Sequence, residues 1–173
     1  VVTGHTHTPR TRSMLGHAGI PIVEMWSVTP KPIDMAIGFS NFEAARTMTR
    51  HIAACGYRKI GFIGGLVEGN DRTQQREEGF KSALKEMKMA FDPDCMIRAP
   101  FDFEAGGAAI HELFRRCPHI DAVFAAADII AIGILLESAR QGWSVPGKFG
   151  LAGFDDTPLS RLMNPAISTV RVP

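Results

Sequence analysis

Cysteine is scarce in this sequence of 173 residues, and its few occurrences form no motif. Cys55, Cys95 and Cys117 are odd in number, lie far apart and include no C-x-x-C pair. This pattern argues against a disulfide-rich secreted scaffold and offers no zinc-ligand spacing. We therefore expect buried free thiols in a protein of a reducing compartment, the cytoplasm.

The sequence also lacks an excess of charge of one sign and lacks long apolar runs. Its 19 basic and 18 acidic side chains give a formal net charge of +1. Such a balance provides no electrostatic footprint for nucleic acid or for an anionic membrane. No run approaches the about 18 apolar residues of a membrane span, although 45% hydrophobic residues suffice for an ordinary globular core. We expect no membrane partner.

Motifs of common enzyme and cofactor classes are missing as well. The sequence has no G-x-S-x-G turn, and Gly61, Gly64 and Gly65 do not match the G-x-G-x-x-G of a dinucleotide site. No nucleophile has a visible partner base. We therefore predict no catalytic residue and no cofactor, while an α/β enzyme that uses arginines as an oxyanion clamp remains an alternative.

What the sequence does contain is an alternation of strand and helix patterns. Short apolar segments bounded by turn residues predict strands, and apolar residues repeating with helical spacing predict helices. The expected strands cover residues 19–25, 35–38, 59–63, 95–98, 121–125, 149–152 and 167–172. The expected helices cover residues 8–16, 41–55, 71–87, 103–115 and 128–141. This alternation predicts an α/β fold with parallel strands and helices on both faces of the sheet.

The segment from Arg58 to Met87 places two arginines beside a sheet edge. A buried strand ends at Gly64–Gly65, a polar loop follows, and Asp71 is a good N-cap for the next helix. Arg72 and Arg76 then lie four residues apart on one face of that helix. Because ligands of open α/β sheets bind at the carboxyl edge of the strands, we predict that both guanidinium groups face a crevice.

The helix that begins at Asp128 is apolar around nearly its whole circumference. One apolar face would suffice to cover a sheet, whereas a helix that is apolar all round is buried all round. Either other helices or a second subunit would cover the following residues: Ile129, Ile130, Ile132, Ile134, Leu135 and Leu136.

Several motifs taken together resemble one protein family. They are the runs Asp128–Gly133, Gly142–Pro146, Gly153–Asp156, Pro165–Val170, Arg76–Phe80 and Gly56–Gly61. In this set and spacing they are very similar to the effector-binding domains of the lactose/galactose-repressor family of bacterial transcription regulators. Within that family, the stretch Ile33–Asn41 looks most like gluconate-utilisation repressors.

The resemblance implies two similar lobes, as in periplasmic sugar-binding proteins, joined by three crossing strands. Residues 1–38 would be a partial amino-terminal lobe, residues 39–166 the carboxyl-terminal lobe, and residues 167–173 a crossover back toward the first lobe. We expect the chain to be a fragment without the DNA-binding headpiece, so that DNA is bound only through a missing segment. A homodimer that binds a small sugar or sugar acid is also expected.

The same resemblance assigns ligand contacts to particular residues. Arg76 matches an effector-contacting arginine, Asp128 an aspartate that accepts from sugar hydroxyls, and Phe101 an aromatic residue that stacks on the ligand. Trp26 is expected to reach the ligand from the first lobe. Further candidates at the same cleft are Arg72, Asp71, Phe39 and His5.

Each principal candidate also has an ordinary structural interpretation. Arg76 would be a solvated helix residue paired with Glu77 or a nearby acid, Asp128 would cap its helix, and Phe101 would fill a turn. Relatives usually carry asparagine where this chain has Ala127, which removes one hydrogen-bonding group from the expected pocket.

The residues that replace carboxylates favour an acidic ligand. Met25 and Phe39 stand where many sugar-binding relatives have acidic side chains. Two arginines with few acceptors beside them suit a sugar acid better than a neutral sugar, although Glu24 and Glu104 could offset this. We therefore predict the effector domain of a gluconate-responsive repressor; the alternative is a periplasmic sugar-binding protein of the same fold.

Two further motifs have less specific interpretations. His5-Thr6-His7 supplies half a metal site at best, so no metal site is predicted. Asp155–Asp156 could act as a paired acid and base, but the D-D-T-P context favours a role in turn formation and helix capping.

Overall fold

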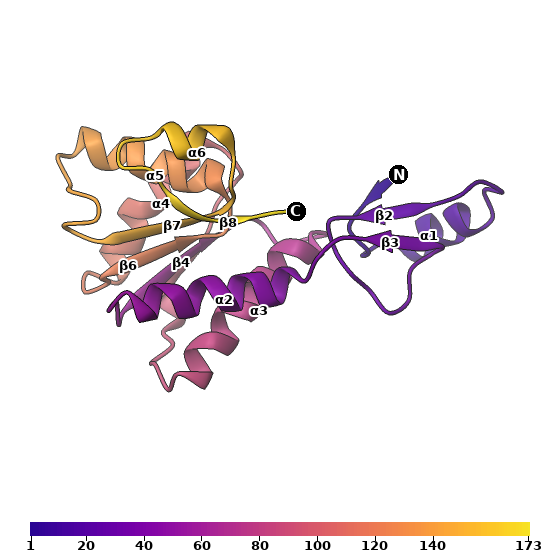
Figure 1. Ribbon diagram of the computed structural model, residues 1–173, viewed down its shortest axis with the longest axis horizontal. Coiled ribbons are helices and arrows are strands. Elements are labelled where there is room, and N and C mark those ends of the chain that lie inside the picture. The colour runs from indigo at the N-terminus through magenta and orange to yellow at the C-terminus, as the bar shows by residue number, and fades with distance from the viewer.

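The computed structural model describes residues 1–173 and has two lobes of unequal size (Figure 1). The elements of the smaller lobe are β1 (Val2–Thr3), α1 (Pro9–Gly16), β2 (Val23–Met25) and β3 (Met35–Ile37). Those of the larger lobe are α2 (Asn41–Ala54), β4 (Ile60–Gly64), α3 (Asp71–Glu86), η1 (Pro93–Cys95), β5 (Met96–Arg98), α4 (Phe103–Arg116), β6 (Ala122–Ala125), α5 (Asp128–Arg140), β7 (Gly150–Asp155), α6 (Pro158–Leu162) and β8 (Ser168–Arg171).

Both lobes are built on parallel sheets. The strand order is β1-β2-β3 in the smaller sheet and β5-β4-β6-β7-β8 in the larger one, and every pairing is parallel. The predicted α/β fold class is therefore confirmed. One boundary differs: a turn was expected from Gly153, but β7 continues to Asp155 because residues 153–155 pair with residues 169–171 of β8.

The larger sheet is covered by helices on both faces. Alternate strand residues point to opposite faces, so Phe62 and Phe124 join the core beneath α2 and α3, while Ile63 and Val123 join the core beneath α4 and α5. These side chains are almost fully buried. The two cores hold the carboxyl ends of the strands at one edge of the sheet, where β4 leads into α3.

Other parts of the same chain account for the apolar character of α5. Ile130 and Ile134 are fully buried in the core that α4 and the sheet share. The two helices approach so closely that a Cβ on Gly133 would lie 2.2 Å from the Phe103 carbonyl oxygen. Of the α5 side chains, Leu136 is 47% exposed. Covering by helices of the chain, one of the two alternatives, thus explains most of this helix without a second subunit.

Two of the three cysteines are bonded to each other, which contradicts the expectation of buried free thiols. Cys95, the last residue of η1, forms a disulfide with Cys117, and their Cα atoms are 5.6 Å apart. Cys55 is free but exposed. Spacing could not reveal the bond, because the fold brings the start of β5 beside the end of α4 across 22 residues of sequence.

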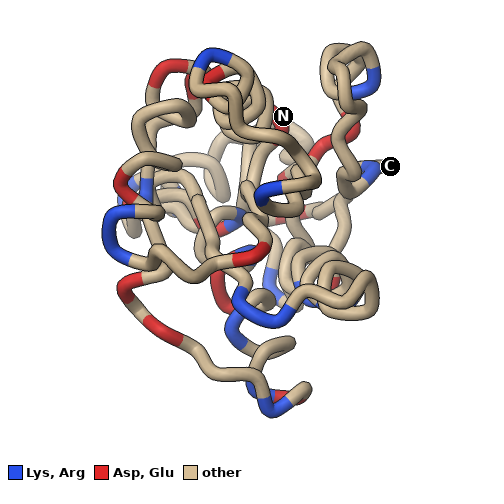
Figure 2. Tube along the Cα trace, turned by 90° about the vertical axis from the view of Figure 1, so that its left-hand side faces the viewer, with Lys and Arg blue, Asp and Glu red and all other residues tan.

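Charges are mixed over the molecule. Figure 2 shows basic and acidic residues interspersed along the trace rather than collected by sign, as the balanced composition predicts. No helix combines the length and apolar character needed to cross a membrane.

Candidate ligand-binding site

A cavity of about 440 Å³ lies where the two lobes meet. The smaller lobe supplies Trp26 from the loop after β2, and α3 of the larger lobe supplies Arg72 and Arg76. The complete lining is Trp26, Phe39, Arg72, Arg76, Asp155, Thr157, Val172 and Pro173. The cavity therefore lies between the carboxyl edge of the larger sheet, the expected location of a ligand, the segment from β3 to α2 and the residues after β8.

Helix α3 points its first turns at this cavity. Its N-cap is Asn70, whose side chain accepts from the Thr73 amide at 3.3 Å, and not Asp71 as predicted. Asp71 is the first helical residue, and its Oδ1 accepts from the Arg72 amide at 2.9 Å. Arg72 and Arg76 follow on one helix face and both line the cavity, as their spacing predicts.

Arg76 is held by three elements of the larger lobe. Its Nε donates to Asn41 Oδ1 at 2.9 Å, and its Nη1 donates to the Ala126 carbonyl at 2.7 Å. The guanidinium carbon lies 3.7 Å from the centre of the Phe154 ring, a cation–π geometry. Nη2 is 3.7 Å from Asp155 Oδ1. The side chain is thus oriented before any ligand arrives, with one nitrogen turned toward the only carboxylate in the lining.

The structural interpretation of Arg76 as a solvated residue paired with Glu77 or a nearby acid is only partly met: Arg76 is not solvated, and the nearby acid is Asp155, not Glu77. The Arg76 side chain is 12% exposed, and Glu77 pairs with Lys81 and Arg98 instead. Burial lowers the pKa of Arg76 to about 10, with Asp155 opposing that shift. Arg76 therefore remains cationic at neutral pH in a poorly solvated place, where a charge-assisted hydrogen bond is strong.

Asp155 is a site residue that the sequence interpretation missed. Burial raises the pKa of Asp155 to about 6, and the neighbouring Arg76 acts in the opposite direction. Its φ of 120° and the φ of 57° at Asp156 make the sharp turn that was expected. Asp156 instead accepts hydrogen bonds from Arg161 and Arg171, which lower its pKa to about 2. Neither carboxylate is the N-cap of α6: that position is Thr157, whose side chain makes no capping hydrogen bond.

Asp71 and His5 connect the lobes beside the cavity but do not line it. The His5 amide donates to Asp71 Oδ2 at 2.7 Å, and His5 Nδ1 lies 2.6 Å from the same oxygen. The backbone at Gly4 has φ +73°, and a Cβ there would lie 2.6 Å from Arg72 Nη1. The smaller lobe thus approaches the first turn of α3 at a position that only glycine fits.

Asp128 lies beneath the cavity rather than in its wall. It is fully buried, and Oδ2 accepts from the Thr157 amide at 2.7 Å and from the Thr157 hydroxyl at 3.0 Å. The Thr169 hydroxyl donates to Oδ1 at 2.5 Å. Asp128 is not the N-cap of α5 either, since that position is Ala127. In this structure Asp128 orients the loop that carries Asp155 and Thr157.

The aromatic candidates differ in position. Trp26 has φ 70°, is 44% exposed and lines the cavity. Phe39 also lines it and lies 6.2 Å, centre to centre, from the Phe154 ring. Phe101 is 42% exposed and covers Gly65 at the end of β4, outside this lining. Glu24 and Glu104 do not line the cavity either, so neither offsets the arginines there.

The histidine pair is divided between two carboxylates. His7 Nε2 lies 3.0 Å from Glu24 Oε1, and Glu24 is 1% exposed. His5 contacts Asp71, as described above. The two residues therefore take part in different contacts within and between the lobes.

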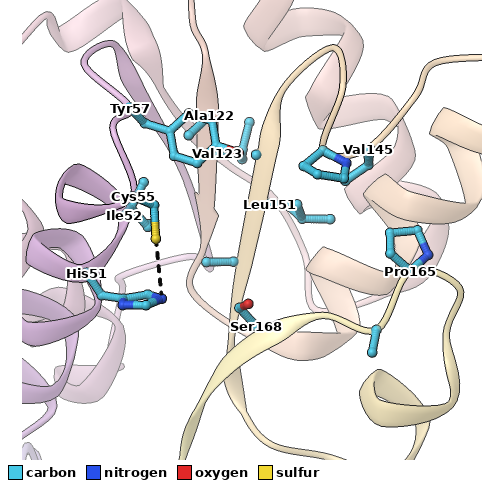
Figure 3. Close-up of a pocket in the computed structure, with 14 residues that line it drawn as sticks. His51, Ile52, Cys55, Tyr57, Ala122, Val123, Val145, Leu151, Pro165 and Ser168 are labelled. Carbon is cyan, nitrogen blue, oxygen red and sulfur yellow. Dashed lines mark hydrogen bonds between the residues drawn. The ribbon is translucent and has the colours of Figure 1, made fainter.

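A second hollow, of about 290 Å³, lies at the opposite edge of the larger sheet (Figure 3). It is bordered by the end of α2, by Tyr57 and by the first residues of β6 and β7. Cys55 Sγ is 3.8 Å from His51 Nε2 there. The lining has no Lys, Arg, Asp or Glu side chain, and it lies at the amino edge of the strands, so the cavity between the lobes is the better candidate site.

One protein-family model matches most of this chain and agrees with the two-lobed architecture. The family model described as "Periplasmic binding protein-like domain" matches residues 49–173. The chain belongs to this family.

Curated relatives resemble this periplasmic binding protein-like domain over its whole length. The HTH-type transcriptional regulator GntR of Escherichia coli K12 is 34% identical over 173 residues, which are 100% of this chain and 51% of the relative. The chain thus spans about half the length of the curated relatives it matches. The predicted similarity to lactose/galactose-type regulators, gluconate-type regulators among them, is confirmed.

Solved structures agree. A LacI family transcriptional regulator from Silicibacter pomeroyi superposes with a TM-score of 0.89 at 38% identity, covering 97% of this chain and 63% of that chain. The transcription regulator GntR from Chromobacterium violaceum gives a TM-score of 0.90 at 28% identity, covering 99% and 63%. These proteins are transcription regulators, not enzymes.

Proposed function

We propose that this domain is the effector-sensing part of a bacterial transcriptional repressor and that its effector is a sugar acid of the gluconate class. The observation that carries the proposal is the cavity between the lobes, with two arginines, one carboxylate and two aromatic side chains in its lining. Such a mixture suits a small ligand with both hydroxyl groups and a negative charge. The ligand is bound without turnover.

The charge of the lining favours an acid over a neutral sugar. Arg72 and Arg76 supply two positive charges, whereas Asp155 is the one acid of the lining, and its pKa of about 6 leaves it partly protonated near pH 6. A ligand carboxylate compensates the excess positive charge, and Arg76 Nη2 and Arg72 are its donors. Hydroxyl groups then pair with Asp155 and Thr157, and Trp26 and Phe39 cover the apolar face of the carbon chain.

The mechanism follows from the position of the cavity. A ligand that contacts Trp26 on one lobe and Arg76 on the other stabilises one angle between the lobes by its difference in affinity for the two arrangements. We propose lobe boundaries at residues 38/39 and 166/167, with Phe39 and Val172 in the connections. In the full-length protein, a cytoplasmic homodimer would pass the change to DNA-binding headpieces as a coupling of about 1–3 kcal/mol.

Calorimetric titration of the full-length protein tests the ligand class. The panel is gluconate, a second aldonate, glucose and glucose 6-phosphate, each at the same ionic strength. We expect gluconate to bind at least tenfold more tightly than glucose, because one charge-assisted hydrogen bond contributes about 1.5–3 kcal/mol. Equal or tighter binding of glucose would contradict the sugar-acid assignment.

A periplasmic sugar-binding protein of the same fold is a second candidate, and the Cys95–Cys117 disulfide is the observation that favours it, since such bonds persist in oxidising compartments. Binding of the full-length protein to DNA upstream of its own gene, with release by gluconate, would distinguish the two. A protein that binds the sugar acid but no DNA supports the periplasmic candidate.

A further inference from the structure

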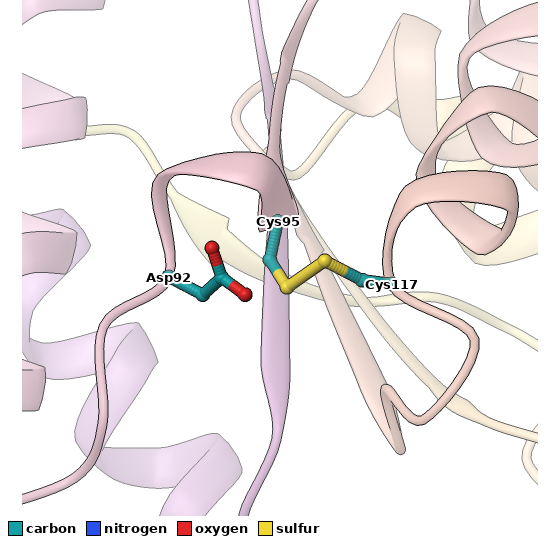
Figure 4. A group of neighbouring side chains, drawn as sticks. All are labelled: Asp92, Cys95 and Cys117. Atoms are coloured by element: carbon teal, nitrogen blue, oxygen red, sulfur yellow. A yellow bond between two sulfur atoms is a disulfide. The ribbon is translucent and has the colours of Figure 1, made fainter.

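The Cys95–Cys117 pair lies at the amino edge of the larger sheet, away from the cavity between the lobes. Cys95 directly precedes β5, and Cys117 directly follows α4 (Figure 4). In a cytoplasmic protein, as proposed above, thiol buffers reduce ordinary disulfides, and those that do form are usually transient and redox-responsive. In such a protein, a second molecule must therefore reduce and re-form this disulfide.

A hollow of about 280 Å³ beside the pair has a basic lining. It includes both cysteines, the acid Asp92 and four basic residues: Arg58, Lys59, Arg116 and His119. The Arg58 guanidinium donates to the carbonyls of Ala53 and Tyr57 rather than to a carboxylate. Glu112 is shared between Arg116 and Arg115. Among its Lys, Arg, Asp and Glu side chains, the lining therefore has three basic residues and one acid, Asp92.

We propose that Cys95–Cys117 is a thiol–disulfide exchange site for an acidic low-molecular-weight thiol, an inference that rests on the proposed cytoplasmic function. A thiol that carries carboxylates is attracted by the basic lining, and its thiolate is the attacking group. Cys95 is half-buried whereas Cys117 is 7% exposed, so Cys95 Sγ is the sulfur that is attacked.

The exchange takes two balanced steps. The small thiolate forms a bond to Cys95 Sγ, the Cys95–Cys117 bond breaks, and Cys117 leaves as a thiolate that takes a proton from water. A second small thiolate then attacks the mixed disulfide and releases Cys95 as a thiolate. Two small thiols become one small disulfide, and their two electrons reduce the protein pair. The small disulfide reverses the reaction.

Asp92 gives the pair a superficial likeness to a metal site. Its carboxylate and the two sulfur atoms lie within 4.8 Å of one another (Figure 4). Metal ions bind thiolates, however, and not bonded sulfur atoms, and the basic lining disfavours a cation. The Asp92 side chain instead accepts from the Asp94 amide at 2.9 Å.

Opening the bond would loosen one edge of the sheet. Strand β5 is an edge strand that pairs only with β4, through residues 96–98. Without the disulfide, the residue before β5 is no longer tied to the residue after α4. The proposed exchange thus changes the local stability of the strand that leads to Phe101.

The experiment compares an acidic with a neutral thiol on the oxidised full-length protein. Reduced glutathione and 2-mercaptoethanol are the probes. Differential alkylation and mass spectrometry measure the fraction of protein molecules that retain the Cys95–Cys117 disulfide. Relative to the rates at which the two thiols reduce a neutral model disulfide, we expect glutathione to be favoured several-fold. Lys59→Gln or added salt should remove most of this preference, whereas Lys31→Gln, a change in the smaller lobe, should leave it intact.

Three outcomes would overturn the proposal. The pair stays bonded in a large excess of reduced glutathione, the two cysteines remain free thiols in oxidised glutathione, or glutathione has no advantage over the neutral thiol. Titration of the same samples with gluconate measures ligand binding, and so tests the proposed function independently of the exchange reaction. Loss of gluconate binding with normal exchange would contradict the ligand assignment and not the exchange site.

Discussion

At the scale of single residues, Asp155 decides how the cavity responds to pH. Burial raises its pKa to about 6, so between pH 4 and 6, roughly, the folded protein binds a proton that an unfolded chain has released. The contribution of Asp155 to folding stability therefore decreases as the pH rises through this window. Because Arg76 Nη2 lies 3.7 Å from Asp155, a carboxylate held by Arg76 lies next to this group.

This arrangement predicts how the affinity for an acidic ligand depends on pH. Ionised Asp155 repels a sugar acid, so gluconate affinity should fall as the pH rises from 5 to 7, by up to about tenfold per pH unit. Calorimetry at several pH values measures the fall. In Asp155→Asn the dependence should disappear. Affinity that rises with pH in the unchanged protein would contradict an acidic ligand beside Asp155.

At the scale of secondary-structure elements, the cover of α5 depends on close helix packing. The backbones of α4 and α5 approach each other at Gly106 and Gly133, where a Cβ would lie 2.5 Å and 2.2 Å from a carbonyl oxygen of the facing helix. Backbone atoms cannot move aside as a flexible side chain can. The two glycines thus fix how deeply α5 is buried.

Gly133→Ala should therefore lower the free energy of unfolding by about 1–3 kcal/mol, the usual cost of overpacking a core. Urea denaturation measures it. Gly16→Ala is the matched control, because Gly16 ends an exposed helix and a Cβ there meets no atom within 4 Å. That control should change stability by less than about 1 kcal/mol. Equal effects of the two substitutions would show that the helices can separate freely.

At the scale of the whole molecule, the proposed mechanism makes Arg76 the link between ligand binding and the angle between the lobes. Arg76→Ala in the full-length protein should weaken effector binding roughly tenfold to a hundredfold, because a charge-assisted hydrogen bond is lost. DNA binding without effector should persist. The substitution also leaves Asn41 Oδ1 and the Ala126 carbonyl without their donor, so stability should fall as well.

Fluorescence anisotropy measures this response as the release of operator DNA when gluconate is added. Arg116→Ala is the control, since Arg116 also pairs with an acid but lies on α4, outside the cavity. The control should release DNA at the normal gluconate concentration. A normal response of Arg76→Ala would remove Arg76 from the site.

The order of strands and helices, and the common facing of Arg72 and Arg76, could be read from the sequence. Both depend on local periodicity: apolar spacing selects strand or helix, and residues four apart share a helix face. The site assignments of Arg76, Trp26 and the other predicted residues stay predictions, although the structure brings Arg72, Arg76, Trp26 and Phe39 to one cavity.

The tertiary structure alone decided which side chains meet across the lobes. Asp155 enters the cavity and Asp156 turns to Arg161 and Arg171, although the same D-D-T-P turn explains both equally well from sequence. The Asp128 carboxylate accepts hydrogen bonds from two threonines. Phe101 covers Gly65, and Cys95 forms a disulfide with Cys117. Local sequence determines backbone conformation, whereas these contacts join residues far apart in the chain, and their distances are set only when the helices have packed on the sheet.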